Sequence, residues 1–282
     1  MVSQEQRKRQ LAREKFLRQQ QRRTAARRKT RMRNAVVASV LGVVIVGSMV
    51  SYATGVFKND DDQAKASSEA TPSAQPTSKA PDPCEKPAAG KVKSLSYKKE
   101  PAITIDKSAD YTMKLQTTCG TMDIDMPASK APHTVNSFNF LVGKGYLDHT
   151  KCHRLTTQGI YVLQCGDPKG NGTGGPGYTI PDENLKDTRL KGNVYPAGTV
   201  AMANQYNAQT KQGRNSGGSQ FFLVYQDSQL PPDYTPFGTI SKDGMKVLKK
   251  IATAGAEPAD PTTGNTAPNA TVVINKATVT KS

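Results

Sequence analysis

The sequence has few of the side chains on which metal and nucleophilic sites depend. Its 282 residues include three histidines, four cysteines and no tryptophan. His149, Cys152 and His153 lie close together, but no fourth metal ligand accompanies them, and the cysteine spacings match no zinc template. Ser219 lacks the glycine frame of a nucleophile elbow, and the glycine-rich stretch 172–177 does not open a helix as a dinucleotide fingerprint must. The sequence therefore indicates no metal, no cofactor and no hydrolase chemistry.

The four cysteines allow two interpretations. An even number suits two disulfides in an oxidising compartment, although four cysteines permit three pairings. Reduced and buried thiols are the alternative, because a free cysteine behaves as a small apolar residue. The residues concerned are Cys84, Cys119, Cys152 and Cys165.

Acidic residues are also scarce: 23 Asp and Glu stand against 39 Lys and Arg, which gives a formal net charge of +16. The imbalance is concentrated at the N-terminus, where residues 1–34 hold 13 Lys or Arg and two acids, Glu5 and Glu14. That segment alone carries +11, and the remainder carries only about +5. The charge therefore belongs to a basic tail.

A charge-free stretch follows the tail. Residues 35–57 contain no charged side chain, and as a helix these 23 positions span ~34 Å, enough for the ~30 Å hydrocarbon core of a membrane. Because a basic flank stays in the cytoplasm, we expect a single-pass anchor in the cell membrane with a cytoplasmic N-terminus and an extracytoplasmic C-terminal domain. Alternatively, Ser51 and Ala53 could be the −3 and −1 positions of a cleaved signal peptide, although the basic lead is long for one.

The basic tail, residues 1–34, is expected to form a helix that lies on anionic lipid. Such a polybasic stretch beside a membrane span is attracted to anionic headgroups. Phe16 is its only aromatic residue, so it offers little for stacking on bases, and we expect no nucleic-acid partner. A solvated helix with no specific partner is a simpler alternative, and nucleic-acid binding would show as a steep dependence of affinity on salt.

Residues 58–100 have the composition of a disordered linker. Three consecutive aspartates, five prolines and scattered serines and alanines offer little apolar surface to bury. Such a linker would hold a folded domain away from the membrane. Residues 101–282 are long enough to build a sizeable core, so we expect one folded, monomeric domain there.

Several short strands and two helices are predicted within the folded part. Apolar residues alternate over 111–118 and again over 121–126, which is typical of a β-hairpin. A helix is predicted from Pro132 to about Gly143 and a second over 243–253. Further strands are predicted over 161–165, 199–203, 220–225 and 271–280. This pattern indicates a mainly β protein, an antiparallel barrel or sandwich capped by helices.

Seven sequence blocks make the interpretation specific. In order they are Gly145-Tyr-Leu-Asp-His-Thr-Lys-Cys-His-Arg154, Gln164-Cys-Gly-Asp-Pro168, Gly172-Thr-Gly-Gly-Pro-Gly-Tyr178, Pro181-Asp-Glu-Asn184, Gly198-Thr-Val-Ala-Met-Ala-Asn204, Gly218-Ser-Gln-Phe-Phe222 and Pro236-Phe-Gly238. With these blocks, residues 108–280 resemble the cyclophilin family. The resemblance implies a closed eight-stranded antiparallel β-barrel with two capping helices. It also implies peptidyl-prolyl cis/trans isomerase activity on proline-containing polypeptide clients, without metal, cofactor or covalent intermediate.

The resemblance also assigns roles to individual residues. The catalytic set that it implies is Arg154, Gln164, Asn204, Gln220 and Phe222. The substrate-binding set that it implies is Tyr161, Val162, Ala203, Leu230 and Tyr234.

Three departures from the family pattern fall at or beside these residues. The spacing from Arg154 to Gln164 is two residues longer than usual, and about seven residues are inserted within 205–214. The family's pocket histidine falls on Tyr234. Two hypotheses of different class therefore stand: an isomerase, and a cyclophilin-like module that binds proline segments while turning them over slowly.

The chemistry of proline isomerisation suits the expected residues. Rotation about an X–Pro bond passes through a state without amide resonance, with an intrinsic barrier near ~18–20 kcal/mol. In that state the prolyl nitrogen regains a lone pair, which a fixed guanidinium such as that of Arg154 can hydrogen-bond. Apolar side chains would hold the pyrrolidine ring and the amide side chains would hold the flanking backbone, so no general base is needed.

Overall fold

The computed structural model describes residues 81–260 and 265–282. The basic tail, the charge-free stretch 35–57 and most of the expected linker lie outside the described residues. Within the described part, neither helix is both long and apolar enough to cross a membrane.

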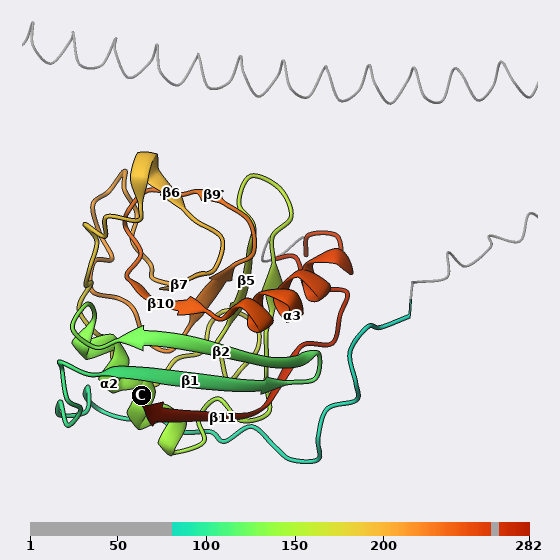
Figure 1. Ribbon diagram of the computed structural model, residues 1–282, viewed down its shortest axis with the longest axis horizontal. Helices are drawn as coiled ribbons and strands as arrows, with labels where there is room; N and C mark the ends of the chain where they lie inside the picture. The colour runs from blue at the N-terminus through green and yellow to red at the C-terminus, as the bar shows by residue number, and fades with distance from the viewer. Residues whose placement is uncertain (1–80, 261–264) are drawn as a thin grey trace, which may run out of the picture. The chain divides into compact units, whose positions relative to one another are not determined.

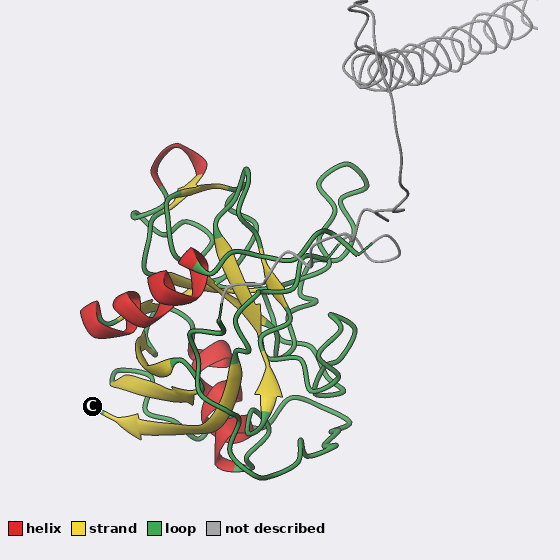
Figure 2. Ribbon diagram, turned by 90° about the vertical axis from the view of Figure 1, so that its right-hand side faces the viewer, coloured by secondary structure: helices red, strands yellow, loops and turns green. Residues whose placement is uncertain are grey.

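The described part is mainly β and rich in loops (Figures 1 and 2). Two α-helices, α2 (Pro132–Gly143) and α3 (Lys242–Thr253), and one 3₁₀ turn, η1 (Lys191–Asn193), accompany the strands. The strands are β1 (Asp110–Thr117), β2 (Gly120–Pro127), β3 (Thr150–Lys151), β4 (Arg154–Leu155), β5 (Val162–Cys165), β6 (Val194–Tyr195), β7 (Thr199–Met202), β8 (Phe221–Val224), β9 (Ser228–Gln229), β10 (Pro236–Ile240) and β11 (Val273–Lys281).

Nine of these strands form one antiparallel sheet in the order β3-β11-β1-β2-β10-β7-β8-β5-β4, and β6 pairs with β9 separately. The hydrogen-bonded order runs from β3 to β4 without returning to β3, so the sheet curls into an open half-barrel. The expectation of a closed eight-stranded barrel is therefore wrong. The physical reason is that the two end strands, only two residues long, follow each other in one chain segment and do not pair with each other.

The expected β-hairpin is confirmed as β1 and β2, which pair from Asp110–Pro127 to Thr117–Gly120. Because successive side chains of a strand point to opposite faces, every second residue faces the core. Met113 and Leu115 on β1, and Ile124 and Met126 on β2, are fully buried. The strands expected at 161–165, 199–203, 220–225 and 271–280 are confirmed as β5, β7, β8 and β11.

Helix α2 packs against β11 and brings Phe138 into the core, where its ring centroid lies 4.9 Å from that of Phe237 and 5.4 Å from that of Phe221. Its N-terminus has no cap from its own flank. Instead Glu183 accepts hydrogen bonds from the backbone N–H groups of His133 (3.0 Å) and Thr134 (2.9 Å). A carboxylate at a helix N-terminus satisfies open donors and complements the helix dipole. Glu183, from the block 181–184, thus caps α2, the first of the two expected helices.

Helix α3 confirms the second expected helix and packs against β2. Its N-cap is Ser241, whose side chain accepts a hydrogen bond from the backbone N–H of Gly244 at 3.1 Å. Leu248 and Ile251 are fully buried on the face that meets the sheet.

The four cysteines form two disulfides, Cys84–Cys119 and Cys152–Cys165, which settles the pairing that the sequence left open. The first disulfide attaches residues 81–100, here called the N-terminal arm. The arm has no helix or strand, yet Leu95 and Tyr97 pack against the main core. Figure 1 shows it in blue-green, running past β11. The sequence assigns these residues to the linker, so the folded part begins earlier than residue 101.

Candidate active site

Strands β4, β5, β8 and β7 present two different faces. One face enters the main core and includes Leu155, Leu163, Phe221, Leu223 and Val200. The intervening residues point outward. In register, Arg154 lies opposite Gln164, Gln164 opposite Phe222, and Phe222 opposite Ala201. Because directly opposed residues of an antiparallel pair share a face, these four side chains form a row on the outer face of the sheet.

The polar half of this row is connected by side-chain hydrogen bonds. Arg154 Nη1 donates to Gln164 Oε1 at 3.3 Å, and Gln164 Nε2 donates to Gln220 Oε1 at 2.9 Å. Gln220 Nε2 donates in turn to the carbonyls of Gly172 (3.0 Å) and Gly174 (2.9 Å). Within the described residues the guanidinium makes this one hydrogen bond, so most of its five N–H donors can face a ligand. The network therefore holds a cation in place without neutralising it.

The apolar half of the row is a small cluster separate from the main core, here called the outer cluster. Its buried members are Val162, Tyr195, Ala201, Phe222 and Val224, and Ile160, Leu190, Ala203, Leu230 and Tyr234 pack against it. Phe222 is 5% exposed, and its ring centroid lies 5.5 Å from that of Tyr234 and 6.2 Å from that of Tyr195. Phe222 lies two strands away from Arg154, roughly 10 Å between Cα atoms at the usual strand spacing. An apolar patch thus lies beside a fixed cation.

The structure brings together most of the expected substrate-binding residues but not Tyr161. Val162, Ala203, Leu230 and Tyr234 all belong to the outer cluster or pack against it. Tyr161 does not: its backbone N–H donates to Ser228 Oγ at 2.9 Å, and its ring meets Tyr225 with 5.8 Å between centroids. Tyr161 adjoins Val162 in an extended segment, so its side chain turns the other way, and Ile160 packs against the cluster in its place.

Tyr195 is a member of the outer cluster that the sequence does not predict. Its hydroxyl donates to the carbonyl of Tyr234 at 2.7 Å and accepts the backbone N–H of Tyr234 at 3.2 Å. Burial raises the pKa of Tyr195 well above its ordinary value, so the phenol stays neutral. The residue fixes the position of Tyr234. It lies in a two-residue strand with no periodic pattern around it, so no sequence signal marks it.

Asn204 and the inserted residues lie at the side of the row. Asn204 Nδ2 donates to the carbonyl of Asp233 at 2.8 Å, and its Oδ1 accepts the backbone N–H of Tyr206 at 3.1 Å. Arg214 forms ion pairs with Asp182 and Asp233, and its guanidinium lies over the ring of Tyr206 at 3.5 Å. These contacts hold the insertion in its own loop, and it contributes nothing to the outer cluster.

Asp167 organises the loop on which Gln220 depends. This buried carboxylate accepts backbone N–H groups of Lys169 (2.7 Å), Asn171 (3.0 Å) and Gly172 (2.6 Å). Burial alone would raise the pKa of Asp167, but these donors hold it below its ordinary value. An ionised side chain therefore positions the loop carbonyls that accept the hydrogen bonds of Gln220. The block 164–168 is one of those that carry the family resemblance, but its sequence does not reveal this role of Asp167.

The preceding residue, Gly166, must be glycine. It has φ +87°, and a Cβ atom there would lie 2.1 Å from the carbonyl oxygen of Ser219. Only glycine tolerates both conditions. The close approach of the end of β5 to the start of β8 therefore requires the glycine of the Gln-Cys-Gly-Asp block.

The described residues contain no group of three His, Cys, Asp or Glu side chains placed to hold a metal ion. The candidate site consists of a fixed guanidinium, a chain of amide side chains and an apolar patch.

Comparison with known proteins finds a matching family model and several similar proteins. The family model described as cyclophilin type peptidyl-prolyl cis-trans isomerase/CLD matches residues 112–279. A protein of Mycobacterium leprae named probable peptidyl-prolyl cis-trans isomerase B is 48% identical over 185 residues, 63% of this chain and 56% of the relative. The protein of that name in Mycobacterium tuberculosis is 47% identical over 155 residues, 52% and 48% of the two chains.

A more distant relative is covered over most of its length. The peptidyl-prolyl cis-trans isomerase cypE of Dictyostelium discoideum is 37% identical over 146 residues, 50% of this chain and 85% of the relative. Among solved structures, a cyclophilin type peptidyl-prolyl cis-trans isomerase of Cryptosporidium parvum matches with a TM-score of 0.46 at 25% identity, covering 61% and 99% of the two chains. This chain spans about half the length of the two mycobacterial relatives.

Proposed function

Because the chain belongs to the cyclophilin-type peptidyl-prolyl cis-trans isomerase family, we propose that it accelerates rotation about X–Pro bonds in polypeptide clients. The observation that carries the proposal is the outward row of the sheet, in which Arg154 and Gln164 stand beside the apolar outer cluster around Phe222. A proline ring needs an apolar surface, and the twisted peptide bond needs a hydrogen-bond donor next to that surface. The row offers both.

Arg154 is proposed to stabilise the twisted amide. When the C–N bond leaves planarity, resonance is lost and the prolyl nitrogen becomes a hydrogen-bond acceptor. A guanidinium remains charged and can donate to that nitrogen only when the bond is twisted, so it favours the transition state over the ground state. Its bond to Gln164 Oε1 fixes its orientation before the client binds, which limits the cost of reorganisation.

The other residues are proposed to hold the client. Phe222, Val162, Leu230 and Tyr234 would surround the pyrrolidine ring, and Ala203 would border it. Gln164, Gln220 and Asn204 would hydrogen-bond the client backbone, so that one side of the X–Pro bond stays fixed while the other turns. Because no bond to the client is made or broken, no nucleophile or general base takes part.

We also propose that the clients are extracytoplasmic. The support is the charge-free stretch 35–57 behind a basic tail of +11, together with two disulfides, which form in oxidising compartments. The chain would then be a single-pass membrane protein with its tail on anionic lipid and its isomerase domain outside. The anchor itself lies outside the described residues.

A protease-coupled assay on the full chain tests the activity directly. Chymotrypsin cleaves an Ala-Pro-Phe peptide only when its Ala-Pro bond is trans. Uncatalysed exchange from cis to trans takes tens to hundreds of seconds, so an isomerase speeds the slow phase of cleavage. We expect a rate proportional to enzyme concentration. Peptide binding without any such acceleration would favour the alternative, a cyclophilin-like module that tethers proline segments.

A further inference from the structure

The inserted segment, residues 205–214, is closed at its base. Gln205 N–H donates to Ser216 Oγ at 2.8 Å, and Ser216 Oγ donates to the carbonyl of Gly213. Gly213 has φ +84°, and a Cβ atom there would lie 2.2 Å from the carbonyl oxygen of Gln205. Only glycine lets the two ends of the segment approach so closely. Arg214, the next residue, therefore leaves the inserted segment at a defined point.

Arg214 binds two carboxylates that come from different parts of the chain. Its Nη1 lies 3.5 Å from Asp182 Oδ2, and its Nη2 donates to Asp233 Oδ1. Both carboxylates are largely buried, with side chains 8% and 18% exposed. Asp182 Oδ2 accepts no hydrogen bond within the described residues, so its charge is compensated by the guanidinium. Without this cation, two carboxylates held close together would repel each other.

The two acidic segments differ in how firmly they are held. Asp182 precedes Glu183, whose carboxylate accepts three hydrogen bonds at the N-terminus of α2. Asp233 lies in residues 230–234, here called the pocket loop. Residues 231 and 232 of this loop are prolines, which have no N–H to donate, and the N–H of Asp233 is used within the loop, on the carbonyl of residue 231. The pocket loop is therefore the partner that would move if the two carboxylates repelled each other.

The pocket loop carries two residues of the proposed proline pocket. Leu230 and Tyr234 both pack against the outer cluster, and Tyr234 meets the ring of Phe222. The hydroxyl of Tyr195 holds the backbone of Tyr234, and Arg214 holds the neighbouring residue, Asp233. A displacement of Asp233 would therefore shift Tyr234 away from Phe222.

We propose that Arg214 is a positioning residue of the proline pocket. By holding Asp233, it keeps Leu230 and Tyr234 packed beside Phe222, so that the apolar surface for the pyrrolidine ring exists before a client binds. Arg214 acts through Asp233, since it is not itself a member of the outer cluster. This proposal rests on the proposed isomerase function. It gives the inserted segment a role in client binding although the segment contributes no side chain to the pocket.

The test compares Arg214→Ala with the parent as full chains. The protease-coupled assay gives kcat and KM, and fluorescence anisotropy with a labelled Ala-Pro-Phe peptide gives Kd. We expect Kd and KM to rise about fivefold, as they would if the pocket loop were correctly placed only about a fifth of the time. The kcat should change little, because Arg154 and Gln164 stay in place. Arg214→Lys keeps the positive charge without the planar fork and should recover most of the lost affinity.

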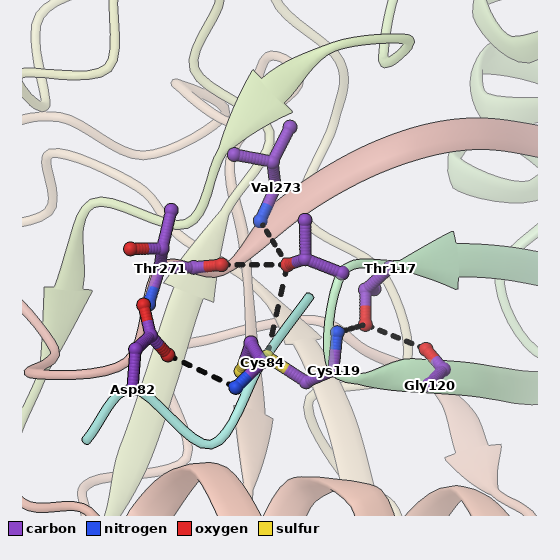
Figure 3. Close-up of a disulfide and its surroundings, with 8 residues drawn as sticks. Asp82, Cys84, Thr117, Cys119, Gly120, Thr271 and Val273 are labelled. Atoms are coloured by element: carbon purple, nitrogen blue, oxygen red, sulfur yellow. Dashed lines mark hydrogen bonds between the residues drawn. A yellow bond between two sulfur atoms is a disulfide. The ribbon is translucent and has the colours of Figure 1, made fainter. Parts of the chain in front are cut away.

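Asp82→Ala is the matched control. Asp82 accepts the backbone N–H groups of Cys84 and Thr271, both at 3.0 Å, and so fastens the N-terminal arm next to the Cys84–Cys119 disulfide (Figure 3). Like Arg214, it is a charged residue that secures a segment without regular structure, but none of the residues in these contacts belongs to the outer cluster. We expect Asp82→Ala to lower the free energy of unfolding in urea and to leave Kd unchanged.

A folded Arg214→Ala protein with the Kd and KM of the parent would overturn the positioning role, because the arginine would then only stabilise the fold. A loss of kcat at unchanged Kd would overturn it as well. If Arg214→Ala does not fold, Tyr206→Leu decides, since it removes the ring that lies over the guanidinium: the proposal requires Kd to rise about twofold, and an unchanged Kd contradicts it.

Failure of the proposed activity gives a different result. If the parent binds the peptide without accelerating its isomerisation, the isomerase proposal fails. The Kd values of the parent and of Arg214→Ala still decide whether the arginine positions the pocket.

Discussion

His153 and Arg154 are neighbours in sequence but face opposite sides of the sheet. The guanidinium points outward to Gln164, whereas the imidazole is 6% exposed and, within the described residues, neither of its ring nitrogens has a hydrogen-bond partner. Burial lowers the pKa of His153; Arg154 and Lys151 lower it further, and Asp167 opposes them. The histidine is therefore neutral in the folded protein at neutral pH.

This histidine should make stability depend on pH. A depressed folded-state pKa means that the unfolded chain binds a proton first, so the free energy of unfolding decreases as pH falls below about 6.5, the ordinary value. The pKa of Asp167 lies below its ordinary value, so that carboxylate does not titrate in the same window. Urea unfolding between pH 7.5 and 5 should show a decrease for the parent that is smaller for His153→Leu. Parallel curves for the two proteins would contradict the assignment.

At the scale of elements, strands with one buried face could be predicted and the arm could not. The hairpin of β1 and β2 follows from strict alternation, as at Met113 and Leu115, and the outward row follows from the same rule. Besides Cys84, the arm has only Leu95 and Tyr97 packed against the main core, and it depends on a disulfide whose pairing no spacing determines. The sequence places Tyr161 with Val162 in the substrate-binding set, whereas in the structure its ring packs against Tyr225, because adjacent residues of an extended segment face opposite sides.

Removing the Cys84–Cys119 disulfide should weaken the attachment of the arm. The disulfide closes a sequence separation of 35 residues, and the chain-entropy model assigns such a loop about 3–4 kcal/mol of stability. Cys84→Ser/Cys119→Ser should therefore lower the free energy of unfolding by roughly that amount. Urea denaturation measures it, with mass spectrometry confirming that Cys152–Cys165 is intact. Unchanged stability would mean that the arm contributes no constraint.

At the scale of the whole molecule, charge and apolar character are distributed unevenly. Residues 1–34 carry +11 of the net +16, and residues 35–57 carry no charge. The described part has its own core and its own candidate site. The composition of the two N-terminal segments is the basis of the proposed membrane attachment.

The proposed anchor predicts that the full chain remains in the membrane fraction after washes with high salt and alkaline carbonate. Val44→Arg places a charge in the middle of the span, at a cost of about 2.5–3.5 kcal/mol, and should reduce the retained fraction. The mass of the mature N-terminus distinguishes an anchor from a signal peptide cleaved after Ala53. Release of the unprocessed chain by salt alone would contradict the anchor.

The central claim is that the Arg154 guanidinium stabilises the twisted X–Pro bond beside the outer cluster. Its most direct test is kcat/KM in the protease-coupled assay for the full chain and for Arg154→Ala, with the Kd of the same peptide measured alongside. The account predicts a fall in kcat/KM of about 100-fold or more with Kd changed only a few-fold, because the lost interaction exists only at the top of the barrier. A variant that isomerises as fast as the parent would contradict it.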